Sequence, residues 1–346
     1  MSMTPINQRR LQNFKANRRG YWSLWIFLAL FVLSMFSEFI ANDKPIVFTK
    51  DGQLFVPVFV TYTERELGGV LDTEAVYKDA FVRTLYEPYG WSLWPPIPFS
   101  YDTIHWELEV APTPPDSTHL LGTQGWGSDV LARLLYGFRL SVLFGLSLTL
   151  ISTLIGVTVG ALQGFFGGAV DLVGQRIVEV WSGLPVLFIL IILASMFEPN
   201  VYLLLLILAC FNWMAMVGLV RAEFLRARNF EFVRAARALG VGDFTIMFRH
   251  VLPNALVATL TFFPFLLNGS VTMLTALDFL GFGLPLESPS LGRLLSEAKS
   301  NLQAPWLGIS VVLTLATMLT LLIFVGEAVR DALDPRRVLS SKQAEA

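Results

Sequence analysis

The sequence predicts an all-α polytopic membrane protein with six transmembrane helices and an irregular, partly β segment between the first two. Of its 346 residues, 54% are hydrophobic and only 15% are charged, which is far from the composition of a soluble domain. Long apolar runs recur along the chain, and arginine and lysine gather in the segments that flank them. The single cysteine, Cys210, lies inside an apolar run, so an intrachain disulfide framework and a thiolate metal cluster are both excluded.

Six runs satisfy the requirement of about 20 mostly apolar residues for a membrane-spanning helix. The third has the least defined start, because its apolar run begins at Leu184 and a start near Ile177 carries Glu179 into the bundle. A basic region before an apolar core is also typical of a cleaved signal peptide, but the first core runs on without a small-x-small cleavage site, which favours an uncleaved anchor. The expected spans are 21–40, 140–166, 177–197, 201–220, 256–277 and 306–326.

The distribution of basic residues predicts the orientation, since loops rich in lysine and arginine stay in the cytoplasm. These residues are concentrated in the N-terminal tail 1–20, the loop 221–253 and the C-terminal tail 330–346, whereas the loop 198–200 carries none. With six spans the three basic segments share one side. Both termini are therefore expected in the cytoplasm, and residues 41–135 on the other side of the membrane.

Residues 41–135 contain two distinct subregions. Residues 46–56 read as a β-hairpin, in which Asp51-Gly52 supplies the positive φ that a tight turn requires. Residues 88–115 combine three tryptophans with many prolines, which predicts an ordered but irregular cap. A structural lid and a partner-binding surface explain this segment equally well.

Four of the six expected spans lack the ionisable residues that ion and proton pathways use. No Asp, Glu, Lys, Arg or His occurs in 140–166, 201–220, 256–277 or 306–326. An ion-coupled transporter would have few groups to work with. Polar amides do occur in the spans: Asn212 and Asn268 could line a translocation path, although hydrogen bonding between helices is the commoner use of such residues.

Catalytic motifs are missing as well. His105, His119 and His250 are far apart in the sequence, and neither a His-Glu-x-x-His helix nor a Gly-x-Ser-x-Gly elbow occurs. The dipeptide Gly-Lys is absent, so the chain has no phosphate loop of the Walker type. We therefore expect no enzyme activity, no metal and no cofactor in this chain. If ATP drives the protein, another subunit binds it.

The loop 221–253 has a helical pattern that an ordinary basic loop lacks. Asn229 can cap a short helix over 230–239, Glu231 suits its positive first turn, and Gly240 can end it in a left-handed conformation. Apolar residues fall at positions i, i+3, i+4 and i+7, and two adjacent alanines allow close approach to a groove. This apolar stripe consists of Phe232, Ala235, Ala236 and Leu239.

A second short helix can begin with Asp243 as its cap and run through Arg249, after which Leu252-Pro253 is expected to turn the chain back into the membrane. The positive-inside rule explains the arginines of the loop but not two capped helices with a glycine joint. We expect the first helix to dock on a cytoplasmic partner. The residues assigned to this contact are Phe230, Glu231, Phe232, Arg234, Ala235, Ala236, Leu239 and Gly240.

The pattern resembles the EAA loop of ABC importer permeases, which reads Glu-Ala-Ala, three residues, Gly, nine residues, Ile-x-Leu-Pro. Ala235-Ala236, Gly240 and Leu252-Pro253 fit with that spacing, while Arg234 replaces the glutamate and His250 the isoleucine. In that family the loop couples to the ATP-hydrolysing subunit. The resemblance implies that the shape of the helix matters more here than the missing glutamate.

Three further runs are similar to the C-type permeases of dipeptide and oligopeptide importers. They are 121–141 before the second span, 277–283 with 289–292 after the fifth, and 326–336 near the C-terminus. Gln124, Ser128 and Leu291 depart from the family pattern. The insertion 41–118 is larger than typical members carry.

The resemblance implies the type I ABC importer permease fold in a bacterial inner membrane. It also implies four kinds of partner: the lipid bilayer, a second permease subunit, two ATPase subunits or domains that bind ATP and Mg²⁺, and a periplasmic peptide-binding protein. Its implied substrates are oligopeptides, including peptide antibiotics of the microcin C type, and nucleic acid is not expected to bind. The alternative is a proton-coupled peptide transporter, and a weaker one is a membrane scaffold with an assembly loop.

Overall fold

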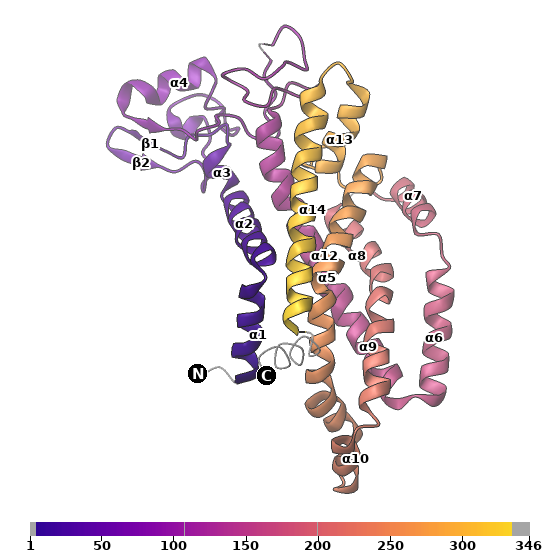
Figure 1. Ribbon diagram of the computed structural model, residues 1–346. Coiled ribbons are helices and arrows are strands. Elements are labelled where there is room, and N and C mark those ends of the chain that lie inside the picture. The colour runs from indigo at the N-terminus through magenta and orange to yellow at the C-terminus, as the bar shows by residue number, and fades with distance from the viewer. Residues whose placement is uncertain (1–4, 107, 199, 334–346) are drawn as a thin grey trace. The chain divides into compact units, whose positions relative to one another are not determined.

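The computed structural model describes residues 5–106, 108–198 and 200–333, and most of them are helical (Figure 1). The chain forms two compact units. Unit 1 takes in Met1–Leu28, Val142–Pro285 and Ala316–Ala346, and unit 2 takes in Ala29–Ser141 and Leu286–Leu315. Three helices contribute residues to both units: α2 (Arg18–Met35), α5 (Val130–Phe166) and α14 (Pro305–Leu333).

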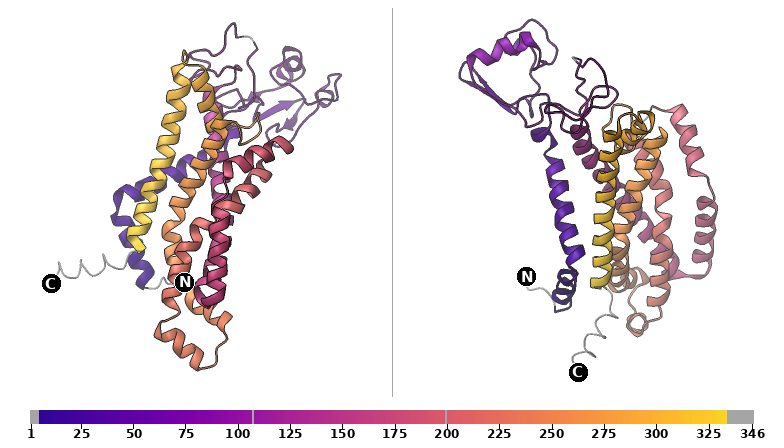
Figure 2. Two further views of the ribbon diagram at one scale, coloured as in Figure 1. Left: turned by 90° about the vertical axis from the view of Figure 1, so that its right-hand side faces the viewer. Right: turned by 45° about the horizontal axis from the view of Figure 1, so that its top comes forward.

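The described residues of unit 1 form helices joined by short turns. Helices α9 and α12 contact each other, and α10 lies at the tip of the hairpin that joins them (Figures 1 and 2). Besides its parts of α2, α5 and α14, the unit contains α1 (Pro5–Ala16), α6 (Gly168–Ser182), α7 (Val186–Met196), α8 (Val201–Asn212), α9 (Met214–Ala227), α10 (Glu231–Ala238), α11 (Asp243–Thr245), the π-helix η3 (Ile246–Val251) and α12 (Leu252–Leu280).

Four continuous helical segments among the described residues are long and apolar enough to cross a membrane: Val130–Phe166, Val201–Ala227, Asp243–Leu280 and Pro305–Leu333. They contain the expected spans 140–166, 201–220, 256–277 and 306–326. Each is longer than its expected span, because the helix continues past the apolar run into polar sequence.

The first and third expected spans differ from the prediction. The third, 177–197, is not one helix, since α6 and α7 are bent by 63° at the break Gly183–Pro185. Proline has no N–H for the helical ladder and its ring clashes with the preceding turn. The first expected span, 21–40, divides into α2 and the short α3 (Ser37–Ile40). A count of six spans therefore stays a prediction.

A row of glycines brings α5 close to α9. Gly156, Gly160 and Gly164 follow one another at intervals of four residues, so they share one face of α5. A Cβ atom at Gly160 would lie 2.8 Å from the carbonyl oxygen of Val217 and 3.0 Å from Cβ of Val220. The absence of side chains on this face thus lets the two backbones approach, as small residues do in membrane helix pairs.

An ion pair joins α6 to α9. The Arg221 guanidinium donates from Nε to Asp171 Oδ1 at 2.5 Å and from its terminal nitrogen to Oδ2 at 2.7 Å. This bidentate geometry matches the two planar groups and strengthens the contact. The sequence analysis did not find this pair, because it placed Arg221 in the cytoplasmic loop and did not consider Asp171.

Unit 2 contains a small antiparallel sheet with strand order β2-β1-β3. β1 (Val47–Lys50) and β2 (Gln53–Phe55) are joined by Asp51 and Gly52, whose φ values are +51° and +78°, so the expected hairpin is confirmed. The expected cap, residues 88–115, is largely irregular as predicted, apart from β3 (Ser92–Leu93) and part of η2 (Glu87–Tyr89). The other elements are α3, η1 (Arg65–Leu67), α4 (Ala80–Tyr86) and α13 (Leu291–Ser300).

An aromatic core holds the sheet against α4. The ring of Phe48 on β1 is fully buried and stacks on Phe55 with centroids 4.9 Å apart. Tyr77 and Tyr86 close over it, and Tyr86 donates a hydrogen bond to the carbonyl oxygen of Tyr77 at 3.2 Å. This segment therefore has a core of its own.

At the other end of the chain, residues 334–346, with Arg336, Arg337 and Lys342 of the expected cytoplasmic tail, lie outside the described residues.

Candidate coupling site between helices α9 and α12

The loop after α9 folds into the short helix that its sequence predicts, over Glu231–Ala238. Gly240 follows with φ +78°, so its expected left-handed conformation is confirmed. The expected cap by Asn229 is wrong. Phe230 occupies the N-cap position without a side-chain hydrogen bond, and the Asn229 amide instead donates to the carbonyl oxygen of Leu225 at 3.2 Å. The α9 helix uses this amide to satisfy its own last turn.

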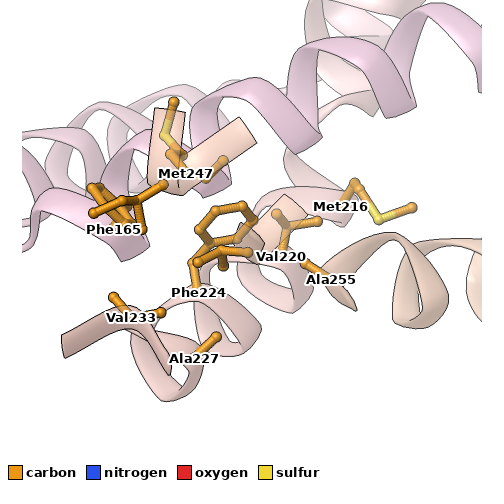
Figure 3. Close-up of a cluster of buried hydrophobic side chains, with 11 residues drawn as sticks. Phe165, Met216, Val220, Phe224, Ala227, Val233, Met247 and Ala255 are labelled. Carbon is orange, nitrogen blue, oxygen red and sulfur yellow. The ribbon is translucent and has the colours of Figure 1, made fainter. Parts of the chain in front are cut away.

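One side of α10 is anchored in a buried apolar cluster. Val233 is fully buried beside Phe224 of α9, and Figure 3 shows both among the side chains that fill this site. Ala236 packs against the same cluster. The other buried members come from α5 (Ala161 and Phe165), α9 (Met216, Val220 and Ala227), η3 (Ile246, Met247 and Val251) and α12 (Ala255).

The opposite side of α10 is apolar and exposed. The side chains of Phe232 and Leu239 are 42% and 84% exposed, and Ala235 is exposed between them. Phe230 adds its ring at 5.7 Å from that of Phe232. We call Phe230, Phe232, Ala235 and Leu239 the outer face. The expected stripe is therefore divided, because Ala236 faces the protein core while its other three members face outward.

The anchor residue Val233 was not predicted from the sequence. Val233 lies three residues before Ala236, so a helical spacing signal was present. It was weaker than the stripe, which has four members, and Val233 gains its role only from partners on α9 and η3. The helix α10 is therefore anchored to the helical bundle through one face and exposed on the other.

The second part of the loop also differs in detail from the prediction. Asp243 is the first residue of α11 and not its cap, which is Gly242. The Asp243 carboxylate accepts a hydrogen bond from Nε of Arg237 at 3.2 Å, and the Arg237 guanidinium lies 5.2 Å from the Phe165 ring centroid. These contacts tie α10 to α11 and α5 across the turn at Gly240.

No turn occurs at Leu252-Pro253, contrary to the expectation. The π-helix η3 runs directly into α12, and Pro253 lies in the first turn of that helix. Proline is tolerated there because a helix does not use the N–H groups of its first turn. Residues Asp243–Leu280 therefore form one continuous helical segment.

The run 277–283 forms a compact turn at the far end of α12. Gly281 ends the helix with φ +84°, and the buried Asp278 carboxylate accepts a hydrogen bond from the Leu284 N–H at 2.6 Å. A Cβ atom on Gly283 would collide with the Asp278 carboxylate. The glycines of this motif thus serve the close approach of backbone to carboxylate.

Both amides that were candidates for the translocation path make hydrogen bonds between helices. Asn212 on α8 donates to the Ser270 hydroxyl at 3.3 Å, and Ser270 lies 3.0 Å from the Thr149 hydroxyl, which joins α8, α12 and α5. Asn268 donates to the carbonyl oxygen of Leu319 on α14 at 3.0 Å. A packing role is therefore visible for both, and a role in the path stays a prediction.

Comparison with known proteins agrees with the motifs. Residues 156–338 match the family described as binding-protein-dependent transport system inner membrane component. The chain is 57% identical over 338 residues to the inner membrane ABC transporter permease protein YejE of Escherichia coli, covering 97% of this chain and 99% of the relative. It is 55% identical over 359 residues to the peptidoglycan transport system permease protein YejE of Agrobacterium fabrum, covering 96% and 94%.

A more distant relative is the oligopeptide transport system permease protein OppC of Haemophilus influenzae, at 33% identity over 240 residues, covering 69% of this chain and 77% of the relative. The two YejE proteins thus extend over almost the whole chain, whereas this match leaves almost a third of it unaccounted for. The resemblance to ABC permeases of the peptide importer type is confirmed. The chain belongs to the inner membrane components of binding-protein-dependent transport systems.

Proposed function

We propose that this chain is the permease subunit of an ATP-driven importer that carries oligopeptides from the periplasm across the inner membrane. The names of the relatives support the substrate class, because they include oligopeptide and peptidoglycan transport permeases. Peptide antibiotics of the microcin C type and peptides released from peptidoglycan are both candidate substrates. The partners are a second permease, two ATPase subunits or domains and a periplasmic peptide-binding protein.

The observation that carries the proposal is the two-faced helix α10. Its outer face is apolar and unpaired within the described chain, while Val233 is locked in a cluster shared with α5, α9, η3 and α12. A groove on an ATPase subunit would bury Phe232, Ala235 and Leu239, as amphipathic helices bury their apolar faces in partner grooves. Closure of the ATPases would then displace α10 and, through Val233, the spans themselves.

This role requires α10 and both termini to lie in the cytoplasm. The arginines of 221–253 and of the N-terminal tail support this orientation through the positive-inside rule. Asn212 and Asn268 remain our candidates for the translocation path: their amides sit at interfaces between spans, and a rocking motion of those spans would break and remake the hydrogen bonds.

The test is uptake into proteoliposomes that contain the permease pair and the ATPases, with the binding protein outside. We expect a labelled oligopeptide to accumulate only when ATP is supplied to the ATPase side. A microcin C-type peptide and a tetrapeptide from peptidoglycan are compared as competitors, which separates the two candidate substrates. Uptake driven by a proton gradient without ATP would refute the proposal in favour of a proton-coupled transporter.

A further inference from the structure

The largest cavity described in unit 2 is a groove formed mostly by the segment between the first two expected spans, with Glu38 and Tyr136 also in its lining. Its volume is about 1380 Å³. Proline and aromatic residues make its walls, among them Pro57, Pro96, Pro98, Trp94 and Trp106. We propose that this groove is a binding site for the transported peptide, and that the Lys78 ammonium in its lining binds a free peptide carboxylate.

Lys78 is held in place by a stack of rings. Its Nζ lies 3.6 Å from the centroid of Phe99, and the Phe99 ring lies 4.4 Å from that of His119. The His119 ring is buried, with Nδ1 at 2.8 Å from a carboxylate oxygen of Asp129 and Nε2 at 3.0 Å from Nδ1 of His105. The second Asp129 oxygen accepts from the Ala132 N–H in the first turn of α5. The Phe99 ring that contacts Lys78 thus lies against a hydrogen-bonded network around the buried His119.

This network corrects the sequence analysis, which treated the histidines as unrelated because of their separation. His105 and His119 meet through the fold of the irregular cap. Among the described residues no group of three His, Cys, Asp or Glu side chains could hold a metal ion. His105 lines the groove, and both imidazole rings lie against the Phe99 ring beside Lys78.

Among the lysine and arginine side chains that line the groove, Lys78 is the one without a polar partner in the described part of the chain. It is half-buried, and within the described part of the chain its ammonium makes no ion pair and no hydrogen bond. By contrast, Lys44 is paired with Glu74, Arg83 with Glu87, and Glu38 with Arg139. The charged or titratable residues that line the groove are Glu38, Asp43, Lys44, Glu74, Tyr77, Lys78, Asp79, Arg83, Tyr101, Asp102, His105 and Tyr136.

A half-buried ammonium without an acceptor favours an anionic ligand group. Desolvation makes such a charge costly unless it is paired and hydrogen-bonded, so a carboxylate that enters the groove gains a charge-assisted contact. Phe99 alone supplies attraction through its ring face. Burial lowers the pKa of Lys78 to about 8, with Asp43 and Asp129 opposing the shift, so the group is still largely charged at pH 7.

The size and walls of the groove favour a peptide over a smaller anion. Its volume of about 1380 Å³ exceeds the roughly 300–1,000 Å³ of sites for small molecules. Exposed aromatic rings such as Trp106, which is 84% exposed, can stack on peptide side chains. The inference rests on peptides as the proposed substrate class, but it does not depend on ATPase docking at α10.

The experiment uses the assembled transporter in nanodiscs, without nucleotide and without the binding protein. The probe is a pentapeptide with an N-terminal fluorophore and no acidic side chain, prepared with a free and with an amidated C-terminus. Anisotropy gives both dissociation constants. We expect Lys78→Met to weaken binding of the free-carboxylate peptide about tenfold, the loss of one charge-assisted contact, and to leave the amidated peptide unchanged.

Two further variants keep the result interpretable. Arg65→Met is the matched control, because Arg65 is an exposed cation of the same segment that pairs with Asp72 and does not line the groove. Lys78→Arg retains the charge, so it should bind the peptide while losing the pH dependence. In the wild type, affinity should fall between pH 7 and pH 9 as Lys78 loses its proton, whereas the arginine variant should stay constant over this range.

Three outcomes would overturn the inference: equal affinity of the wild type for both peptides, unchanged binding in Lys78→Met, or a loss in Lys78→Arg as large as in Lys78→Met. A fourth is weaker docking of the binding protein to Lys78→Met with unchanged peptide affinity, since the groove would then serve that partner. ATP-dependent uptake is measured separately. Loss of ATP-dependent uptake would contradict the proposed function. Uptake that persists without peptide binding in the groove would contradict only this inference.

Discussion

Leu239→Ala tests whether the outer face of α10 is a docking surface. Leu239 is 84% exposed, so its truncation removes almost no contact within the chain. Full burial of a leucine side chain is worth about 1.5–3 kcal/mol, and most of it is available to a partner here. Allowing for the methyl group that alanine retains, we expect about 1.5 kcal/mol of lost binding energy, which is about a tenfold weaker complex with the ATPases.

The assay titrates labelled ATPase subunits onto the permease pair in nanodiscs and reads the dissociation constant. Leu302→Ala is the matched control, because Leu302 is 83% exposed but lies in the turn after α13, which the topology prediction places outside the cytoplasm. Thermal unfolding should be unchanged in both variants. The reasoning would be refuted if the two variants bound the ATPases equally well, or if Leu239→Ala lowered the melting temperature.

The remaining predictions concern the path from α10 into the bundle. Val233→Ala should destabilise the protein by about 1–2 kcal/mol, because the buried side chain loses apolar contact and leaves a cavity. It should also reduce ATP-dependent uptake, although the residue is not exposed on α10. Unchanged uptake and an unchanged melting temperature would contradict this prediction. Gly160→Ala should lower the melting temperature, because the added Cβ meets α9. Gly218→Ala, where a Cβ meets nothing within 4 Å, should leave the melting temperature equal or higher. Equal effects of the two variants would contradict the close packing of α5 on α9. Arg221→Met should lower the melting temperature more than Arg176→Met does, because the Arg176–Glu179 pair is much more exposed than the Arg221–Asp171 pair. The reverse order would contradict a stabilising role of the Arg221–Asp171 pair.

Patterns confined to one element were predicted well. The hairpin at Asp51-Gly52 follows from backbone sterics, and the helix 230–239 with its glycine end follows from spacing and φ alone. The apolar runs place four of the expected spans, because a spanning helix must satisfy its backbone internally wherever it lies. Such features need no knowledge of distant contacts.

Features that depend on a partner elsewhere in the chain were not predictable in this way. Asp171 and Arg221 are 50 residues apart, and only the packing of α6 on α9 makes them a pair. His105 and His119 meet because an irregular, proline-rich segment folds back on itself, and periodicity carries no information about that path. Pro185 was visible in the sequence, yet the apolar character around it concealed the break.

The helix α10 shows how a sequence pattern can identify a surface and still misassign its residues. The two adjacent alanines look equivalent in the sequence, but Ala236 packs on the cluster around Val233 and Ala235 faces outward. A charge at Ala236 would therefore act on the anchor, and a charge at Ala235 on the partner. Coupling needs both properties at once, because an exposed helix without an anchor would bind without moving the spans, and an anchored helix without an outer face would have nothing to move it.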